Sequence, residues 1–473
     1  RERDWSSDVC SSDLIAQDEI FAKQEELIDL AKKIWENPEM SFQEVKASQW
    51  IAEFLEKEGF AVERAYAGVP TALRAVWGSG KPVIGFLGEY DALSALSQKV
   101  STQREAVVEG APGHGCQHNL MTPACIGAAL GLKKEMEEKG LSGTIVVYGC
   151  PAEEVLTGKV FMARGGAFRE LDLAFSWHGG PSCGMTTLGT VTTALNSAKF
   201  HFKGVTSHAA ADPQNGRSAL DAVQLMNMGC EFLREHVTDD VRIHYAFTDV
   251  PSSPNVVPGK ASVWYFCRAL SREAVEDAYA RIVRVAEGAA HMTDTQLEVE
   301  FTGGCYEMLN NKVLFELCNQ VVKDVVPTVW SQEDIDFAKA LNEQSPIYQK
   351  MIDSGKIKAG TQLEENLVFD MNETLVSGGG STDVADVQHI CPTMMLTTPS
   401  SCIGAPGHSW QNAACAGHSI GMKGMLYGAR VMAVAALKAV EDPSIIQAAK
   451  AEFEEKTAGH PYVCPIPEEV PVP

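Results

Sequence analysis

The sequence lacks the features that mark several large classes of protein. No uninterrupted apolar run approaches the ~20 residues that a membrane-spanning helix needs, so we expect no membrane span. Basic residues are outnumbered, with 39 Lys and Arg against 62 Asp and Glu and a net charge of −23. Because phosphate neutralisation needs clustered Lys and Arg, this balance excludes a general nucleic-acid-binding protein. The chain also has no internal repeat and no low-complexity tract.

The cysteines lack a paired arrangement. There are 13 of them, an odd number, scattered along 473 residues. In a chain of this length such a distribution favours a reducing compartment, and we therefore expect a cytoplasmic protein. Most of these thiols are expected to behave as small buried hydrophobes.

The first fourteen residues, "RERDWSSDVCSSDL", lack the apolar segment of a signal peptide. They are polar, and "DWSSDVCSSDL" also reads like the translation of a sequencing-adapter oligonucleotide. We therefore expect residues 1–14 to be a non-native leader outside the fold. The remaining chain is too long for one compact core, so two or three domains are expected.

After the leader, helical and strand-like patterns alternate. Two amphipathic helices are expected between Ile15 and Gly59, and the apolar strands "TALRAVWG", "KPVIGFLGEY", "GTIVVYGC" and "LDLAFSWHGG" follow. A helix in "LMTPACIGAALGLKKEMEEKG" lies between the second and third of these strands. Apolar strands that alternate with helices predict an α/β domain with a mostly parallel sheet, whose site residues follow the strands.

The pattern changes near Thr193. "NSAKFHFKG" alternates with period two, and a helix over 217–236, strands "VRIHYAFT" and "ASVWYFCRAL", a helix over 271–289 and strand "QLEVEFT" follow. This βαββαβ order predicts a ferredoxin-like α+β domain over residues 194–306. It would be inserted into the larger α/β domain, which is made of residues 15–193 and 307–473. Within the latter, 327–378 is a polar, irregular insertion, "CPTMMLTT" a strand and "MKGMLYGARVMAVAALKAV" a long buried helix.

Four short stretches at strand ends or in loops carry residues that bind metals. They are Cys116 and His118 in "GHGCQHNL", Glu153 and Glu154 in "YGCPAEE", His178 in "AFSWHGG" and His408 in "APGHSWQ". Each alone has a plainer interpretation: a thiol and an imidazole in a core, acids at a helix N-terminus, or a satisfied core histidine. Together they suit Zn²⁺ or Mn²⁺. They are too many for one tetrahedral ion with an open position, so two divalent ions are plausible.

These stretches also resemble one protein family. "NPEMSFQE", "GHGCQHNL", "YGCPAEE", "HAAADPQNGRSALDAV", "SPNVVPGKASVWYFCRA", "STDVADV" and "GHSWQ" are similar to motifs of the M20 metallopeptidases, in their amidohydrolase branch. The resemblance runs from about Trp35 to the C-terminus. It implies a zinc-peptidase-like catalytic domain, an inserted lid or dimerisation domain, and two divalent ions, Mn²⁺ or Zn²⁺.

The resemblance also implies roles for the candidate residues. The residues that match its metal ligands are Cys116, His118, Glu154, His178 and His408, with the thiolate of Cys116 in the bridging position. Glu153 matches the general base. No role is assigned to His114, for which a structural position is expected. Gln117 replaces a glycine that is usual between the first two ligands, which would alter the loop if that position needs a positive φ.

In the inserted domain, Asn255 and Arg268 match residues that bind substrate. A guanidinium fork suits a substrate carboxylate. His208 matches a histidine that reaches across a dimer and stabilises the tetrahedral oxyanion in the partner's site. The resemblance therefore implies a homodimer, or a heterodimer with a paralogous chain. Without it, a surface salt bridge for Arg268 and a turn position for His208 would be the simpler interpretations.

The expected activity is hydrolysis of an amide bond in a small substrate with a free carboxylate. The substrate would be an N-acyl amino acid or an aryl-amide such as p-aminobenzoyl-glutamate. Glu153 would take a proton from a metal-activated water and pass it to the leaving nitrogen. Three alternatives stay open: a dipeptidase or auxin-conjugate-like hydrolase of the same family, a thiol enzyme with Cys116 as nucleophile and His118 as base, and the non-catalytic binding component of a hetero-oligomer.

Overall fold

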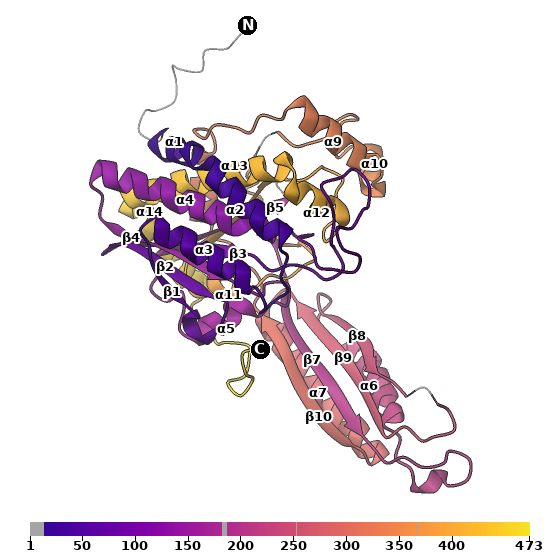
Figure 1. Ribbon diagram of the computed structural model, residues 1–473. Coiled ribbons are helices and arrows are strands. Elements are labelled where there is room, and N and C mark those ends of the chain that lie inside the picture. Colours follow the sequence, from indigo (N-terminus) through magenta and orange to yellow (C-terminus); the bar gives the residue numbers. More distant parts are fainter. Residues whose placement is uncertain (1–13, 182–186, 252, 366) are drawn as a thin grey trace.

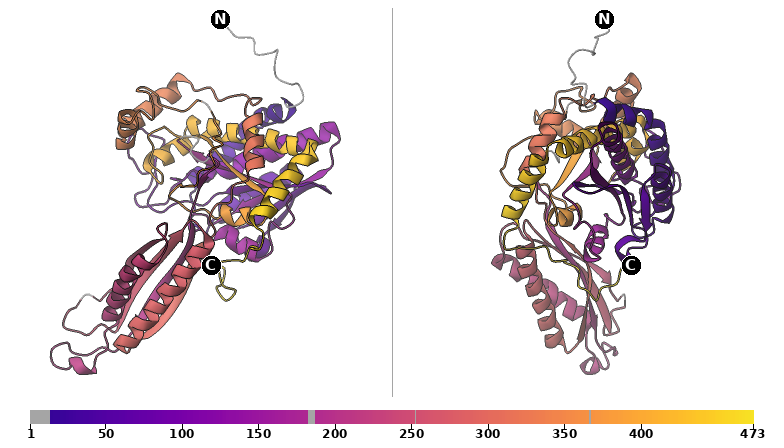
Figure 2. Two further views of the ribbon diagram at one scale, coloured as in Figure 1. Left: turned by 180° about the vertical axis from the view of Figure 1, so that it is seen from behind. Right: turned by 90° about the vertical axis from the view of Figure 1, so that its left-hand side faces the viewer.

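The computed structural model describes residues 14–181, 187–251, 253–365 and 367–473. The expected leader lies outside the described residues except for Leu14, which begins the helix α1 (Leu14–Ala22). The described chain forms an α/β body from which an elongated inserted domain projects (Figures 1 and 2).

A sheet with the strand order β1-β2-β4-β3-β5-β12 organises the α/β body. Its strands are β1 (Ala61–Arg64), β2 (Leu73–Ser79), β3 (Val83–Glu89), β4 (Gly143–Cys150), β5 (Leu173–Gly180) and β12 (Thr393–Pro399). β4, β3, β5 and β12 run parallel, as the apolar strands predict, whereas at one edge β2 pairs antiparallel with β4 and β1 pairs antiparallel with β2. Residues that follow the parallel strands therefore meet at a single edge of the sheet.

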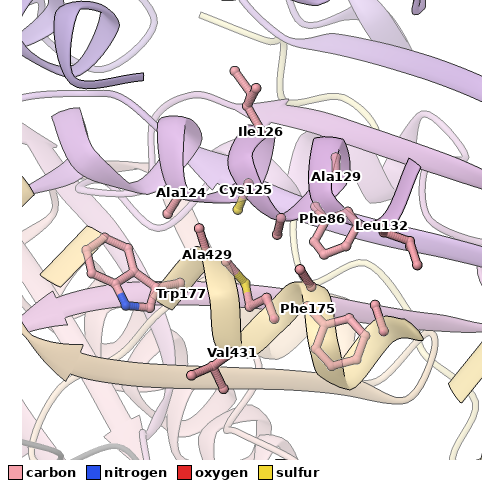
Figure 3. Packing of buried hydrophobic residues seen from close by; sticks show 14 of the residues in the cluster. Phe86, Ala124, Cys125, Ile126, Ala129, Leu132, Phe175, Trp177, Ala429 and Val431 are labelled. Carbon is pink, nitrogen blue, oxygen red and sulfur yellow. The ribbon is translucent and has the colours of Figure 1, made fainter. Parts of the chain in front are cut away.

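Helices cover both faces of this sheet. The helices on one face are α1, α2 (Gln24–Glu36), α3 (Val45–Lys57), α4 (His118–Lys139), α8 (Lys312–Val321), α13 (Ser419–Glu441) and α14 (Pro443–Lys456). Beneath them Phe86, Phe175 and Trp177 pack against residues of α4 and α13 (Figure 3). The helices α5 (Gly158–Arg164) and α11 (Val384–Gln388) pack on the opposite face, around a second core.

The helix α13 is the long buried helix that the sequence predicts. By length and composition alone it could cross a membrane, but 94% of its most apolar window is buried inside the protein. Gly428 allows close packing on the sheet, because a Cβ atom there would lie 2.2 Å from Nε1 of Trp177. Its apolar character is therefore explained by its place in the core.

The N-terminal helices differ from the prediction of two. The first predicted helix is divided at Lys23, whose φ of −93° and ψ of 1° depart from helical values, so α1, α2 and α3 are separate helices. Hydrogen bonds from Lys23 to Glu19 and from Leu27 to Lys23 continue across the division. The apolar spacing therefore persists through the kink, which explains why periodicity did not reveal it.

The inserted domain has the predicted βαββαβ order. Its elements are β7 (Ala194–Lys203), α6 (Ala219–Leu233), β8 (Arg242–Asp249), β9 (Lys260–Ala269), α7 (Arg272–Thr293) and β10 (Gln296–Cys305). The sheet order is β10-β7-β9-β8, and both helices pack on one face of it. The other face stays open, and its end nearest the α/β body borders the cavity described below.

The insertion over 327–378 is more ordered than its polar sequence predicts. It contains α9 (Gln332–Asn342) and α10 (Pro346–Asp353), and β11 (Val376–Ser377) pairs with β6 (Thr190–Val191). A reciprocal capping box between Ser331 and Asp334 begins α9. Short 3₁₀ helices occur at Tyr66–Gly68, Pro213–Asn215 and Arg234–His236.

Candidate metal centre

The predicted metal ligands come from separate parts of the chain and meet at the carboxyl edge of the central sheet. Cys116 precedes α4 and His118 is its first residue; Glu154 follows β4, His178 lies near the end of β5, and His408 precedes α12 (Trp410–Gly417). Parallel strands end at this edge and helices begin there, so residues distant in the sequence become neighbours.

The ligand atoms form two groups that share a sulfur atom. Cys116, His118 and His178 make one group, and Cys116, Glu154 and His408 make the other, with the atoms of each group within 4.8 Å of one another. Sγ of Cys116 lies 3.4 Å from Nε2 of His178, and Nε2 of His408 lies 3.6 Å from Oε2 of Glu154. This arrangement suits two cations bridged by one thiolate.

The site holds more buried negative charge than its hydrogen bonds satisfy. Oε2 of Glu89 lies 3.5 Å from Nε2 of His118, and Oε2 of Glu153 lies 3.8 Å from the same atom. Burial and the neighbouring Glu89 raise the pKa of Glu153 well above its ordinary value, and burial raises the pKa of Glu154 to about 7. Within the described chain, Glu89 Oε2, His118 Nε2 and Glu154 Oε1 are buried without a hydrogen-bond partner. Buried polar atoms are rarely left unpaired, so these three fit bound cations.

The thiol of Cys116 has the properties of a metal ligand rather than of a free nucleophile. Burial raises the pKa of this thiol to about 12. A nucleophilic cysteine needs a lowered pKa, which is the opposite. A coordinated cation would displace the proton and produce the thiolate. This observation disfavours the thiol-enzyme alternative.

A carboxylate that the sequence did not single out orients one of the ligands. Oδ1 of Asp91 lies 2.9 Å from Nδ1 of His118, and Oδ2 accepts hydrogen bonds from Oγ of Ser41 and from the backbone amide of Glu154. Although burial acts to raise it, the contacts with His118 hold the pKa of Asp91 below its usual value. Nδ1 of His118 therefore donates to a carboxylate, and Nε2 is left to bind a metal. The signal was present in "GEYD" at the end of β3, an apolar strand followed by acids.

A buried lysine was also missed in the sequence. Nζ of Lys159 donates to Oε1 of Glu89 at 2.5 Å and to Oδ1 of Asp383 at 2.6 Å, and all three side chains are fully buried. The backbone amide of Lys159 donates to the second oxygen of Asp383. This cation offsets part of the negative charge behind Glu153 and connects the start of α5 with the end of β3 and with the residue that precedes α11.

Four of the five candidate metal ligands, Cys116, Glu154, His178 and His408, line a cavity between the α/β body and the inserted domain. Its volume is about 890 Å³, and its walls include Cys116, Glu153 and His178 on one side and Trp264 and Arg268 on the other. Nη1 of Arg268 donates to Oγ of Ser381 at 2.8 Å. The predicted carboxylate-binding arginine and the predicted general base therefore face the same space.

The structure does not bring His208 or Asn255 into this cavity. The backbone around His208 forms an isolated bridge with Val256, next to Asn255 and beyond the end of β9 at Lys260. Arg268 lies near the opposite end of that strand, roughly 26 Å away at the usual rise per residue. Both side chains are exposed at the distal end of the inserted domain. Within one chain they cannot contact a substrate that Arg268 holds.

Gln117 lies between the first two candidate ligands, and His114 lies two residues before Cys116. Gln117 has a φ of 66°, so the position between the first two ligands does adopt the left-handed conformation that favours glycine. Its buried side-chain amide donates to the carbonyl of Ser400 and accepts from Oγ of Ser400, which holds this conformation in place. His114 is buried and its Nε2 lies 3.2 Å from the carbonyl of Ile34, in a structural position.

The chain is similar to known hydrolases along almost its whole length. Residues 193–293 match the family model described as "Peptidase dimerisation domain" (M20_dimer). Two different p-aminobenzoyl-glutamate hydrolase subunits of Escherichia coli K12 are similar to it. One is 38% identical over 469 residues, covering 96% of this chain and 97% of the relative, and the other is 27% identical over 277 residues, covering 56% and 60%.

Solved structures show the same fold. An aminobenzoyl-glutamate utilization protein from Klebsiella pneumoniae has a TM-score of 0.60 at 16% identity, covering 89% of this chain and 97% of that one. A dinuclear metal-binding peptidase of the M20 family from Bacillus subtilis has a TM-score of 0.55 at 19% identity, covering 89% and 99%. The α/β body and the inserted domain both fall within these alignments.

Proposed function

Since this chain belongs to the M20 metallopeptidase family, whose members hydrolyse amide and peptide bonds, we propose that it cleaves an N-acyl amino acid or an aryl-amide of glutamate. The observation that carries the proposal is the pair of ligand groups sharing Cys116, with Glu153 and Arg268 in the same cavity. The name of the Escherichia coli relative with 38% identity makes p-aminobenzoyl-glutamate the first substrate to test.

The proposed cofactor is a pair of divalent ions, Mn²⁺ or Zn²⁺. Cys116, His118, Glu154, His178 and His408 would hold them, with Cys116 shared between the two ions. Such ions supply the Lewis acidity that activates a water molecule and stabilises the oxyanion of an amide under attack. The unpaired buried atoms of His118 and Glu154 support this assignment.

The remaining chemistry belongs to three side chains. Glu153 faces the cavity, where its carboxylate would take a proton from water and pass it to the leaving nitrogen. Arg268 would hold the substrate carboxylate, because its guanidinium reaches the cavity and forms no ion pair among the described residues. His208 would stabilise the oxyanion in the site of a partner chain, since its own cavity is beyond its reach.

The proposed assembly is a homodimer or a heterodimer with a paralogous chain, formed through the inserted domain. β8 is an edge strand of that domain's sheet, and edge strands pair readily with another chain. On α6 the apolar side chains of Leu225, Met228 and Phe232 are exposed, Phe232 by 70%. The two Escherichia coli relatives are named as different subunits of one hydrolase, which supports a mixed assembly as well as a self-paired one. Such pairing would supply His208 and Asn255 to the neighbouring site.

A cytoplasmic location is proposed on the grounds of cysteine chemistry. The cysteines in the described part of the chain are all free thiols, and most are buried. This distribution suits a reducing compartment. Fractionation of the source cells with an antibody against this chain would test it, and recovery in a secreted fraction would contradict it.

Metal analysis and a substrate screen test the proposed function together. Purified protein should contain close to two equivalents of Mn or Zn, and should cleave p-aminobenzoyl-glutamate faster than dipeptides or other acyl amino acids. EDTA should abolish the activity and added Mn²⁺ or Zn²⁺ should restore it. Activity that survives EDTA would indicate the thiol enzyme, and faster cleavage of dipeptides would indicate a dipeptidase. Binding without cleavage, unchanged in Glu153→Ala, would indicate a non-catalytic binding protein.

A further inference from the structure

A second cavity opens beside the metal centre, where the inserted domain meets the α/β body. Its volume is about 560 Å³, and Arg242, His244, Arg268 and Ser377 are among the residues that line it. Arg268 also lines the cavity of the metal centre, so the two cavities share a wall. A group extending from a substrate carboxylate at Arg268 could therefore enter the second cavity.

Two arginines stand opposite each other in the lining of the second cavity. Arg242 of β8 and Arg268 of β9 are cross-strand partners in the antiparallel pair. Their neighbours Ile243 and Cys267 point into the helix-covered core, so the alternation of a strand places both arginines on the open face. Like charges directly opposite each other destabilise a sheet. An anion bound between the two guanidinium groups would therefore be stabilised by both.

The described chain does not supply that anion as an ion pair. Nη1 of Arg242 donates to the backbone carbonyls of Asp239 and Val241, and Nη1 of Arg268 donates to a hydroxyl, Oγ of Ser381. The carboxylate among the lining residues is that of Asp240, and one of its oxygens accepts the backbone amide of Leu270. Burial acts to raise the pKa of Asp240, but its hydrogen bonds and the charge of Arg242 lower it, so this carboxylate offsets part of the positive charge of Arg242. Among the described residues no ion pair joins it to either guanidinium, so both keep donors for a ligand.

The charge around this cavity is positive in a protein that is strongly acidic overall. Burial lowers the pKa of Arg268. Burial, together with the nearby arginines 268, 234 and 242, lowers the pKa of His244. An anion in the cavity would relieve this repulsion, because it would pair with both guanidinium groups. A neutral group would leave it unchanged.

We propose that Arg242 and Arg268 form a two-arginine site for a substrate that carries two carboxylates. The proposal rests on the proposed amide hydrolysis and deepens it. Arg268 would bind the carboxylate nearer the scissile bond, and Arg242 the carboxylate at the end of the side chain. The amino acid released would then be acidic, glutamate or aspartate. A substrate whose amino acid has a neutral side chain would leave Arg242 without an anionic partner, so the site would favour substrates with an acidic side chain.

A matched pair of substrates tests this selection. p-Aminobenzoyl-glutamate and p-aminobenzoyl-glutamine have nearly the same shape, but the glutamine compound has one carboxylate fewer. We expect the kcat/KM of the wild type to be about 10- to 100-fold higher for the glutamate compound than for the glutamine compound, because one charge-assisted hydrogen bond contributes a factor of this size. Arg242→Gln should lose this preference through slower cleavage of the glutamate compound alone. Equal rates on the two compounds by the wild type would overturn the two-arginine site and leave the proposed hydrolysis standing.

A control variant separates this effect from a general loss of positive charge. Arg234 lies near His244 but forms a bidentate pair with Glu231 and does not line the cavity. Arg234→Gln should therefore keep the preference for glutamate. If Arg234→Gln and Arg242→Gln reduce the preference equally, the effect comes from long-range charge and the direct contact with Arg242 is refuted.

A binding measurement tests the site without any hydrolysis. Glutarate carries two carboxylates and butyrate one, and isothermal titration calorimetry of the metal-loaded protein measures both. Wild type should bind glutarate at least ~10-fold more tightly, about the worth of one further charge-assisted hydrogen bond. Arg242→Gln should bind the two alike while its melting temperature stays near that of wild type. Arg242-dependent binding of glutarate by a protein that cleaves no amide would support the site and refute the proposed function. Equal binding by wild type would refute the site.

Discussion

The carboxylate of Asp91 and the imidazole of His118 meet 2.9 Å apart at a depth where neither side chain reaches solvent. Asp91 follows β3 and His118 begins α4, so the contact joins a strand end to a helix start. The second oxygen of Asp91 accepts the backbone amide of Glu154. One carboxylate therefore fixes the position of two candidate metal ligands.

Removal of this charge should weaken metal binding. Asp91→Asn keeps the shape but leaves Nδ1 of His118 with a weaker acceptor, and we expect metal affinity to fall by about 10- to 100-fold. Titration against a chelator of known affinity measures the change. Ser41→Ala, which removes only the hydroxyl that donates to Asp91, is the control and should have a much smaller effect. Equal metal affinity in Asp91→Asn and wild type would remove Asp91 from the positioning role.

Glu153 should be needed for turnover but not for metal binding. Glu153→Gln removes the proton acceptor, and we expect kcat to fall by about 10²- to 10⁴-fold because that is the range of general acid–base catalysis. Metal content, measured by mass spectrometry, should stay near that of wild type. If metal content falls with activity, the roles assigned to Glu153 and Glu154 have been exchanged.

Cys116 should determine the occupancy of both ions because its sulfur belongs to both ligand groups. Cys116→Ser should lower the metal content per chain below one equivalent, since a serine hydroxyl stays protonated and binds soft cations poorly. Cys464→Ser alters a thiol of similar exposure outside both ligand groups and should leave metal content unchanged. Two retained equivalents in Cys116→Ser would show that the sulfur is not a shared ligand.

The buried lysine should matter for folding. Lys159→Met leaves Glu89 and Asp383 buried without their cation, and we expect the free energy of unfolding to fall by about 3–5 kcal/mol. Denaturation with guanidinium chloride measures it. Lys57→Met breaks an exposed pair with Glu26 and should change stability by about 1 kcal/mol or less. Similar losses in the two variants would show that burial adds nothing to this ion pair.

Asp386 should make stability depend on pH. Burial raises its pKa from 3.8 to about 7 in the folded protein, although the amide of Tyr306 and the hydroxyl of Tyr462 donate to it. Because the folded value is the higher one, the stabilising contribution is fully present below about pH 4 and is lost as the pH rises to about 7. This group should lower the free energy of unfolding by up to about 1.4 kcal/mol per pH unit in that range.

The Asp386→Asn variant isolates this contribution. It keeps the side-chain shape without the titratable proton, so the free energy of unfolding, measured by denaturation across the same pH range, should vary less steeply than in wild type. Asp239→Asn, at an exposed position, should retain the wild-type slope. The same slope in Asp386→Asn and wild type would place the pH dependence elsewhere.

Much of the fold could be predicted because its strands are strongly patterned. β3, β4 and β5 are apolar, and each has a polar side chain at, near or just after its end, and the alternation in β7 marked the start of the inserted domain. β1 was not predicted because its four residues are mostly exposed and show no alternation of apolar and polar residues. α9 and α10 were not predicted because their sequence is polar, although the capping residue Ser331 is a sequence signal for the start of a helix.

The candidate site could be predicted where the residue type suggests a ligand, or where a residue matches a motif of the family, as Glu153 and Glu154 do in "YGCPAEE". Cys116, His178 and His408 stand out in a sequence because thiols and imidazoles bind metals. Lys159 and Asp383 do not, because acidic and basic residues are common and their burial is visible only in three dimensions. Asp91 follows an apolar strand in "GEYD", but that pattern alone did not single it out. The spacing of apolar residues indicates which face of a helix or strand is buried. It does not indicate which charged side chains will be buried with that face.

The length of β9 has a consequence for how many chains make one working site. His208 lies beyond one end of β9 and Arg268 lies near the other end. A single chain therefore cannot bring both side chains to the same substrate. Specific activity would then fall on dilution, as the assembly comes apart. A chain disabled at Glu153 and a chain disabled at His208, each inert by itself, would together regain part of the turnover, since one of their two shared sites would again be whole.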